Sequence, residues 1–350
     1  MIANGSNADR NHLLAGIRER IRNDLDRMNR IVADFERKGL PFEADDIITE
    51  YHRIISEHTL FTFMEDVITQ LKQMGKTRTE ETYRSALNSY RRFRNGEDIM
   101  LDDITSDEMV LYEASMANRG VCPNSTSFYM RILRATYNRA VEKGIVEQKY
   151  PFKHVYTGVG KTVKRAIGIN DIKRIKQLDL TLQPSLAIAR DIFLFSFYTR
   201  GMTFVDIAYL RKKDLCNGII TYRRHKTGQL LNIKVEKYAQ EIIDRYSSPD
   251  SDYIFPFIKI EGDEYHQYRN ALRLINGKLK KIGGMIGTPI KLTTYVGRHS
   301  WGSAAKTSNI PISVISESMG HDNETTTQIY LASLDTSVID QANAKILKKL

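Results

Sequence analysis

The chain has 350 residues, more than one compact domain ordinarily holds, and its length predicts two domains with an appendage. Its 52 Lys and Arg outnumber its 42 Asp and Glu, and the net charge of +10 favours a polyanionic partner such as nucleic acid. Cys122 and Cys216 are too few and too far apart for a zinc cluster or a disulfide framework, so free thiols in a reducing compartment are expected. No apolar run approaches the ~20 residues that span a bilayer, and the polar start from Met1 to Asp9 differs from a signal peptide. These features predict a cytoplasmic protein with no membrane partner.

Residues 1–58 are predicted to form a helical appendage. Apolar residues recur at helical spacing from Asn11 to Lys38, and Gly39 to Pro41 end the pattern. A shorter helix is predicted from Ala44 to Ile55. Because the charges of the long helix alternate in sign, a packing or oligomerisation role is favoured over DNA reading.

Residues 59–149 carry four further helical patterns. These are predicted at Leu60 to Met74, Thr79 to Phe93, Thr105 to Asn118 and Asn124 to Lys143. Thr105 and Glu108 have the spacing of a capping box at the start of the third pattern.

Arginines interleave with aromatic residues in the second and fourth of these patterns. That arrangement suits helices that rest on a phosphate backbone, although a solvated basic face over an aromatic core is the alternative. The candidate DNA-binding residues are Arg84, Arg91, Arg131 and Arg134.

Residues 150–168 are rich in glycine and lysine and lack a sustained apolar period, which predicts an exposed interdomain linker. Lys161 and Lys164 are DNA-binding candidates there, but a soluble tether explains the composition equally well. Residues 169–350 form the next predicted domain, which is mostly helical. Within it, Ile219 to Arg224 and Leu230 to Val235 are predicted to form a β-hairpin with Lys226 at its turn.

Five residues of this last region have the types that phosphate chemistry requires. A tyrosine hydroxyl has an unperturbed pKa of about 10, so its attack on a phosphodiester needs cations that neutralise the phosphate. Arg298, His299 and Ser300 are consecutive and are expected to open a helix; Gly320 precedes His321, and Tyr330 follows nine residues after that histidine. In order and spacing, Arg200, Lys226, Arg298, His321 and Tyr330 resemble the catalytic residues of the tyrosine recombinase, or phage integrase, family.

The resemblance extends from Asn170 to Ser333 for the catalytic domain, and the preceding four-helix region resembles the family's core-binding domain. It implies a mainly α protein. The expected parts are a helical, SAM-like core-binding domain and a mixed α+β DNA breaking-rejoining catalytic domain with a small antiparallel sheet.

The resemblance also implies roles. Tyr330 is the expected nucleophile, and Arg298 offers a planar fork of donors to two phosphate oxygens. His321 donates a ring N–H to the same phosphate, with Gly320 ending the helix that begins at Pro311. Lys226 protonates the departing 5′ oxygen. Taken singly, Tyr330 and His321 are more often a core aromatic and a helix-end histidine, and lysine is common at turns.

Two positions depart from the family pattern. Thr203 fills the usual place of the first catalytic arginine, and Arg200 lies one helical turn earlier, from which a shared helix face would let it reach the phosphate. Asp206 then supports the site. Tyr295 fills the slot that usually holds histidine and is counted with the catalytic residues because its phenol can bond the nucleophile or the phosphate. His299 is assigned a supporting role.

The implied activity is site-specific recombination of double-stranded DNA through a 3′-phosphotyrosyl intermediate, with no metal ion or other cofactor. The implied assembly is a tetramer on two DNA sites, with an accessory DNA-bending protein as a further partner. An apolar helix pattern from Val338 to Leu350 is expected to dock on a neighbouring protomer or on its own subunit. Integration, excision and inversion stay open, and the helical pattern of residues 1–58 favours an invertase over an integrase with a β-rich arm-binding domain.

Two alternatives remain. A type IB topoisomerase shares the tyrosine chemistry but joins no second site. A noncatalytic DNA-binding regulator with the same fold is motivated by Thr203 and Tyr295.

Overall fold

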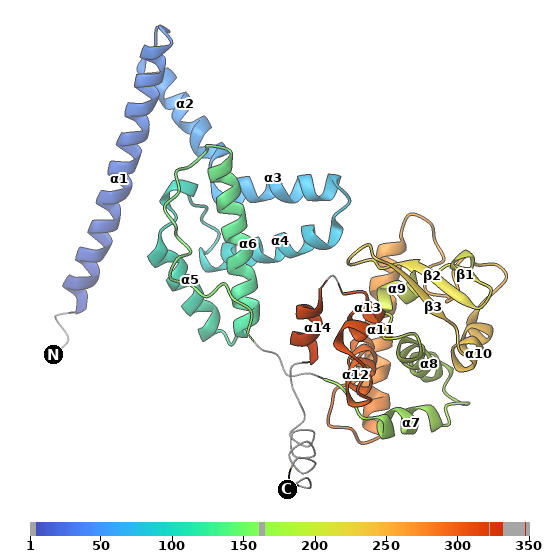
Figure 1. Ribbon diagram of the computed structural model, residues 1–350. Coiled ribbons are helices and arrows are strands. Elements are labelled where there is room, and N and C mark those ends of the chain that lie inside the picture. The colour runs from blue at the N-terminus through green and yellow to red at the C-terminus, as the bar shows by residue number, and fades with distance from the viewer. Residues whose placement is uncertain (1–4, 161–164, 322, 332–346, 348–350) are drawn as a thin grey trace. The chain divides into compact units, whose positions relative to one another are not determined.

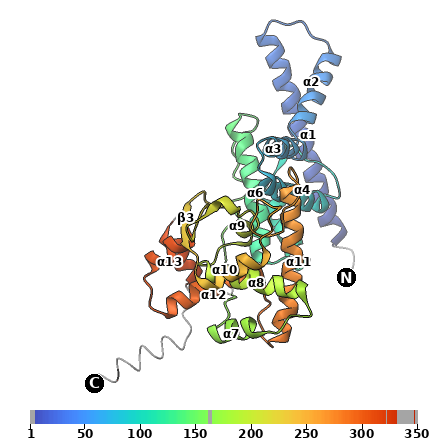
Figure 2. The same ribbon diagram turned by 90° about the vertical axis from the view of Figure 1, so that its right-hand side faces the viewer.

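The protein, described here by a computed structural model for residues 5–160, 165–321, 323–331 and 347, divides into two compact units (Figures 1 and 2). They comprise residues 1–161 and 162–350. None of the helices in the described part of the chain has both the length and the apolar character needed to cross a bilayer.

The first unit begins with two helices that lie side by side, α1 (Gly5–Arg37) and α2 (Ala44–Glu57) (Figure 2). Arg27 of α1 is only 6% exposed. Its guanidinium pairs with Asp24 at 2.8 Å and with Asp103 at 2.9 Å. Since Asp103 lies 76 residues further along, this ion pair fixes α1 against the helices that follow.

Those helices are α3 (Leu60–Gln73), α4 (Thr77–Phe93), α5 (Ser106–Asn118) and α6 (Pro123–Glu142), as the sequence predicts. Their core contains three fully buried tyrosines, Tyr90, Tyr112 and Tyr137. The hydroxyl of Thr105 accepts a hydrogen bond from the Glu108 backbone N–H at 3.2 Å, so the N-cap half of the predicted capping box forms, while the Glu108 carboxylate accepts from Tyr90 and Arg94 instead.

The predicted linker differs from the structure at its start. Phe152 is 6% exposed and Val155 is 7% exposed, and both belong to the core of the first unit. The expectation of an exposed segment is therefore corrected for Pro151, Phe152 and Val155, whereas Tyr150 is exposed as expected. The cause is that Phe152 packs its ring against Tyr137, with centroids 6.2 Å apart. Lys161 and Lys164 lie outside the described residues.

The second unit is built around α8 (Pro184–Tyr198), which contacts α7 (Ile169–Gln177), α9 (Phe204–Ala208), α10 (Lys237–Tyr246), α11 (Glu264–Met285) and α12 (Thr294–Thr307). Four consecutive residues of α8 are buried, Ile192 to Phe195, because the helix is covered on all sides. Two short helices, α13 (Ile312–Met319) and α14 (Glu324–Leu331), follow α12 and pack against it (Figure 1).

A small antiparallel sheet of three strands completes this unit, in the order β1 (Leu215–Cys216), β2 (Ile219–Arg223) and β3 (Leu230–Lys234). Ile220 pairs with Ile233 and Tyr222 with Leu231, and these four side chains face the core. The predicted hairpin is confirmed, and so is the mainly α fold with a small antiparallel sheet.

Candidate active site

Arg298 is the most constrained side chain of the candidate site. It lies on α12 and is 2% exposed. Its Nη1 donates to the Gly201 carbonyl at 2.7 Å, and its Nη2 donates to the Met319 carbonyl at 2.6 Å. Because α12 begins at Thr294, the motif that starts at Arg298 lies in the second turn and does not open the helix as expected.

Gly201 makes this placement of Arg298 possible. It has a φ of +75°, and a Cβ at this position would lie 2.9 Å from Cγ and 3.0 Å from Cα of Arg298. A side chain here would be strained by its backbone and would collide with the arginine stem. The backbone therefore approaches Arg298 closely enough to accept a hydrogen bond from its guanidinium.

His321 follows Gly320, whose left-handed conformation, with a φ of 64°, ends α13 as predicted. The Nε2 atom lies 3.0 Å from Arg298 Nη2, and Nδ1 lies 2.6 Å from the Thr327 hydroxyl oxygen. Burial, followed by the charges of Arg298, Arg224 and Lys226, lowers the pKa of His321 to about 4. The imidazole is thus neutral at pH 7, and Arg298 can donate only to an unprotonated Nε2, which places the ring proton on Nδ1.

Tyr330 belongs to α14, which contacts both α12 and α13. It comes one helical turn after Thr327, the residue that bonds His321. The helix that carries the expected nucleophile is therefore joined to the histidine by a hydrogen bond. The side chain of Tyr330 lies outside the described part of the structure, as does the tail predicted from Val338 to Leu350 except for Leu347.

The hairpin turn brings two cations to the site. Lys226 is exposed, as a turn residue, and its charge acts on His321. Arg224, two residues earlier, is 6% exposed, and its Nη1 donates to the Gly320 carbonyl. From the sequence, Arg224 is predicted at the end of a hairpin strand, with no role in the site. The alternation of buried residues along β2, Ile220 and Tyr222, continues to Arg224 and was the signal that would have found it.

Arg200 does not lie on a helix face shared with Thr203, so the helical argument for it was wrong. It follows α8, precedes α9 and has a φ of +58°. Its Nη1 points to the Asn232 carbonyl of β3, at 3.4 Å. Its charge acts on Tyr222, together with those of Arg298 and Arg224.

Asp206 connects α9 to the hairpin turn. It is 3% exposed and accepts hydrogen bonds from the Thr203 hydroxyl at 2.5 Å and from the His225 backbone N–H at 2.8 Å. The His225 ring also lies 3.6 Å from this carboxylate. Burial raises the pKa of Asp206, but the bonds from His225 and Thr203 outweigh it and leave the pKa below its ordinary value.

The predicted residues Tyr295 and His299 lie on α12 with Arg298, as does Ser300. Tyr295 is 50% exposed, and the edge of its ring meets His299 with centroids 4.7 Å apart. Ser300 is buried, and its hydroxyl accepts a hydrogen bond from the Ile167 backbone at 2.9 Å, which holds the start of the second unit against α12.

The four candidate DNA-binding arginines of the first unit have local partners. Arg84 pairs with Glu80 at 2.7 Å, and both Arg84 and Arg91 reach Glu65. Arg131 lies over the Phe128 ring at 6.0 Å, and Arg134 donates to the Thr157 hydroxyl at 2.9 Å.

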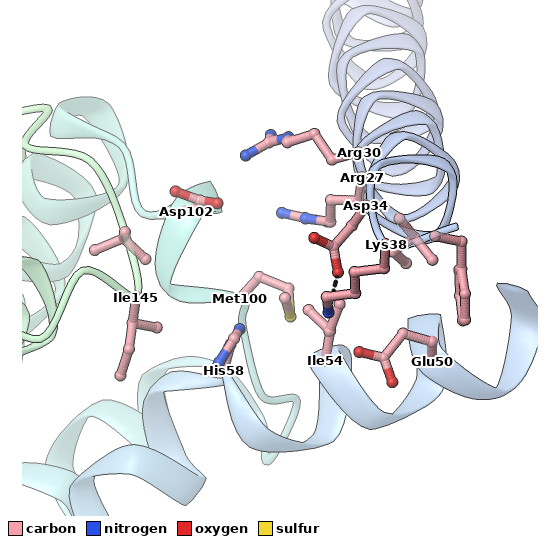
Figure 3. A pocket seen from close by; sticks show the side chains of 13 residues that line it. Arg27, Arg30, Asp34, Lys38, Glu50, Ile54, His58, Met100, Asp102 and Ile145 are labelled. Carbon is pink, nitrogen blue, oxygen red and sulfur yellow. Dashed lines mark ion pairs between the residues drawn. The ribbon is translucent and has the colours of Figure 1, made fainter. Parts of the chain in front are cut away.

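A hollow of about 390 Å³ in the first unit is separate from these catalytic candidates (Figure 3). Charges of both signs line it, including Arg27, Arg30, Asp34 and Glu50, and Lys38 pairs with Asp34 at 2.5 Å. Among residues 5–160, 165–321 and 323–331, no group of three or more His, Cys, Asp or Glu side chains is arranged to hold a metal ion.

Two family models match the chain in tandem. The phage integrase SAM-like domain matches residues 59–155, and the phage integrase family model matches residues 169–337. The chain belongs to the phage integrase family of tyrosine recombinases. Members of this family are DNA strand-transferring enzymes.

Curated relatives agree with that assignment. Tyrosine recombinase XerA of Thermococcus kodakarensis is 23% identical over 71% of this chain and 85% of its own length. Tyrosine recombinase XerD of Pseudomonas aeruginosa is 21% identical over 78% of this chain and 92% of its own.

Solved structures share the fold. A lambda integrase dimer bound to a COC′ core site has a TM-score of 0.61 at 16% identity, covering 86% of this chain and 84% of that one. The Tn1549 transposon integrase in complex with circular intermediate DNA has a TM-score of 0.59 at 15% identity, covering 82% of this chain and 99% of that one.

Proposed function

We propose that this tyrosine recombinase cuts and rejoins double-stranded DNA at specific sites through a 3′-phosphotyrosyl link to Tyr330. One observation carries the proposal. The buried guanidinium of Arg298 is held by two backbone carbonyls beside His321, and His321 is hydrogen-bonded to the helix that carries Tyr330. This is a fixed positive site next to a tyrosine-bearing helix.

The chemistry assigns one task to each residue. The Tyr330 hydroxyl gives its proton to water as its oxygen attacks phosphorus, forming a phosphotyrosyl bond while the bond to the 5′ oxygen breaks. Lys226, exposed on its turn, gives a proton to that 5′ oxygen. Arg298 stabilises the charge that develops on the phosphate oxygens, and because its donors are already oriented, little reorganisation is needed during the reaction.

His321 enters the reaction as a neutral ring. In the free protein, Nε2 of His321 accepts a hydrogen bond from Arg298. To donate to a phosphate instead, Nε2 must gain a proton, and the Arg298 N–H must donate to the bound phosphate. An anionic phosphate favours this gain because it offsets the three positive charges that lower the pKa of His321. Arg200 is assigned a contact with DNA phosphate, and Tyr295 is assigned a contact with the reacting groups. Asp206 and His299 are assigned supporting roles in the site.

The DNA partner is assigned to both units. Arg84, Arg91, Arg131 and Arg134 would lie along the backbone of double-stranded DNA, and Lys161 and Lys164 are also assigned contacts with DNA. One neighbour of the same fold is a lambda integrase tetramer bound to a Holliday junction. A tetramer on two sites, docked through the C-terminal tail and helped by a DNA-bending protein, is the assembly that we propose in the cytoplasm. An invertase or other simple-site recombinase is the favoured type.

The test is covalent capture. Protein is first mapped on genomic DNA of its source to find a bound site, and a suicide duplex is built on that site with a nick beside the scissile phosphate. Wild type should form a protein–DNA adduct in the presence of EDTA, and Tyr330→Phe should form none while binding the same duplex. An adduct that persists in Tyr330→Phe, or no adduct from wild type, would contradict the proposal.

A further inference from the structure

The family's first arginine is missing at Thr203, so a second guanidinium for the phosphate has to come from elsewhere. We propose that Arg224, the first residue after strand β2, supplies this second phosphate-clamping guanidinium in place of Arg200. The inference rests on the proposed function and names a further residue that touches the scissile phosphate.

Arg224 and Arg298 both donate a hydrogen bond to a backbone carbonyl at the end of α13. Arg298 donates to the carbonyl of Met319, and Arg224 donates to the carbonyl of the next residue, Gly320. The two guanidinium groups therefore grip successive carbonyls at the end of α13, immediately before His321. Paired guanidinium groups at one small site are suited to the separate oxygens of a phosphodiester.

Arg224 also has a guanidinium N–H from which no described residue accepts a hydrogen bond. Its Nε atom is buried and has no hydrogen-bond partner within the described residues. The side chain is 94% buried, as its 6% exposure implies, so water does not readily satisfy that donor. A buried guanidinium donor without a partner is costly, and a ligand oxygen that accepts from it removes the cost.

The surrounding turn is built around this arginine. The Arg224 backbone N–H donates to the Gln229 carbonyl at 2.9 Å, and its carbonyl accepts from the Gly228 N–H at 2.8 Å. Thr227 Oγ1 and Gln229 Oε1 are also buried without a partner in the described part of the chain. Three unsatisfied polar atoms thus gather on one turn, as expected where a polar ligand completes the network.

Arg200 has a different environment. It contacts the Asn232 carbonyl at 3.4 Å, on the strand that follows the turn. The positive charges that act on His321 are those of Arg298, Arg224 and Lys226. Arg224 therefore shares the electrostatic environment of the histidine with Arg298, whereas the charge of Arg200 acts on Tyr222.

Charge-neutral DNA tests the assignment. The suicide duplex is made with an ordinary scissile phosphate or with a methylphosphonate, in which a methyl group replaces one charged oxygen. Arg224→Ala and Arg200→Ala are compared with Arg223→Ala, a matched control because Arg223, the last residue of β2, is the exposed neighbour of Arg224 in the sequence. Arg224→Lys keeps a charge and provides a second variant if the alanine variant unfolds, and thermal unfolding checks the fold of each.

On ordinary phosphate, Arg224→Ala should form adduct on the order of 10²–10³ times more slowly than wild type, the loss typical of one oriented charge-stabilising donor. On methylphosphonate this deficit should largely vanish, because the charge that Arg224 neutralises is gone. Arg200→Ala and Arg223→Ala should show no such difference between the two substrates.

An equal deficit of Arg224→Ala on both substrates, or no deficit on either, overturns the assignment, as does selective rescue of Arg200→Ala. If only Arg224→Lys folds, the same comparison applies to it. In all these cases wild type still forms adduct on ordinary phosphate, so the failure is distinguishable from failure of the proposed function, in which wild type forms none.

Discussion

Asp206 is expected to act as the anchor of the catalytic turn. The change Asp206→Ala removes the acceptor for the Thr203 hydroxyl and for the His225 backbone N–H. A hydrogen bond to a charged group contributes about 1.5–3 kcal/mol. Because His225 is partly exposed and water replaces some of what is lost, we expect the free energy of unfolding to fall by about 2–4 kcal/mol.

The loss should depend on pH. The pKa of Asp206 is below its ordinary value in the folded protein, so its stabilising effect is present above the unfolded pKa, near 4, and is lost as pH falls through the lower folded value. Urea unfolding of wild type and Asp206→Ala at pH 7 and pH 3 measures this. The difference between the two proteins should shrink at pH 3.

Adduct formation on the suicide duplex should slow in the same variant while DNA affinity stays near that of wild type, because the turn that carries Arg224 and Lys226 loses its anchor. Asp214→Ala is a matched control, since Asp214 accepts one backbone N–H from Arg211 at 2.9 Å and lies outside the site. Stability of Asp206→Ala equal to that of the control, or a difference from wild type that is unchanged at pH 3, would refute the reasoning.

Three further predictions concern single positions. Gly201→Ala places a Cβ 2.9 Å from Arg298 Cγ. The unfolding free energy should fall by about 1–3 kcal/mol, and adduct formation should slow. Adduct formation at the wild-type rate would count against the close approach of the Gly201 backbone to Arg298. The pKa of His321 is about 4 in the folded protein, so below pH 6.5 the unfolded state takes up a proton first. By pH 4, the unfolding free energy of wild type should therefore fall by on the order of 1–2 kcal/mol relative to His321→Asn, after allowance for solvent screening. Urea unfolding that changes equally with pH in both proteins would contradict this. Asp191, 2% exposed, accepts from Arg245 at 2.5 Å, so Asp191→Ala should cost about 2–4 kcal/mol without altering DNA affinity, as urea unfolding and a binding titration would report.

Much of the helical architecture was predictable because local signals and packing agree. The helices of the first unit begin and end close to the predicted residues, and the cap at Thr105 forms as its sequence indicates. The hairpin around Lys226 followed from the alternation of apolar and polar residues, which the observed burial of β2 and β3 confirms. The core position of Phe152 was not predictable, since the apolar residues of this basic, glycine-containing segment follow neither a helical nor a strand period.

Only part of the candidate site could be predicted from the sequence. Arg298 on α12, His321 just after α13 and Tyr330 on α14 are set by spacing along the chain, which the sequence records directly. Arg200 was given a helical face that it lacks, because a left-handed residue between two helices leaves little trace when it is not glycine. Arg224 was overlooked because a charged residue at a turn is usually solvated, and its burial depends on the distant carbonyl of Gly320.

The most direct test of the account is the identity of the amino acid that holds the cut DNA strand. Wild-type adduct is captured on the suicide duplex, digested with nuclease and protease, and sequenced by mass spectrometry. The account predicts a nucleotide joined through its 3′ phosphate to Tyr330, with a free 5′ hydroxyl on the released strand. A nucleotide on any other residue, or a 5′-linked phosphate on Tyr330, would contradict it.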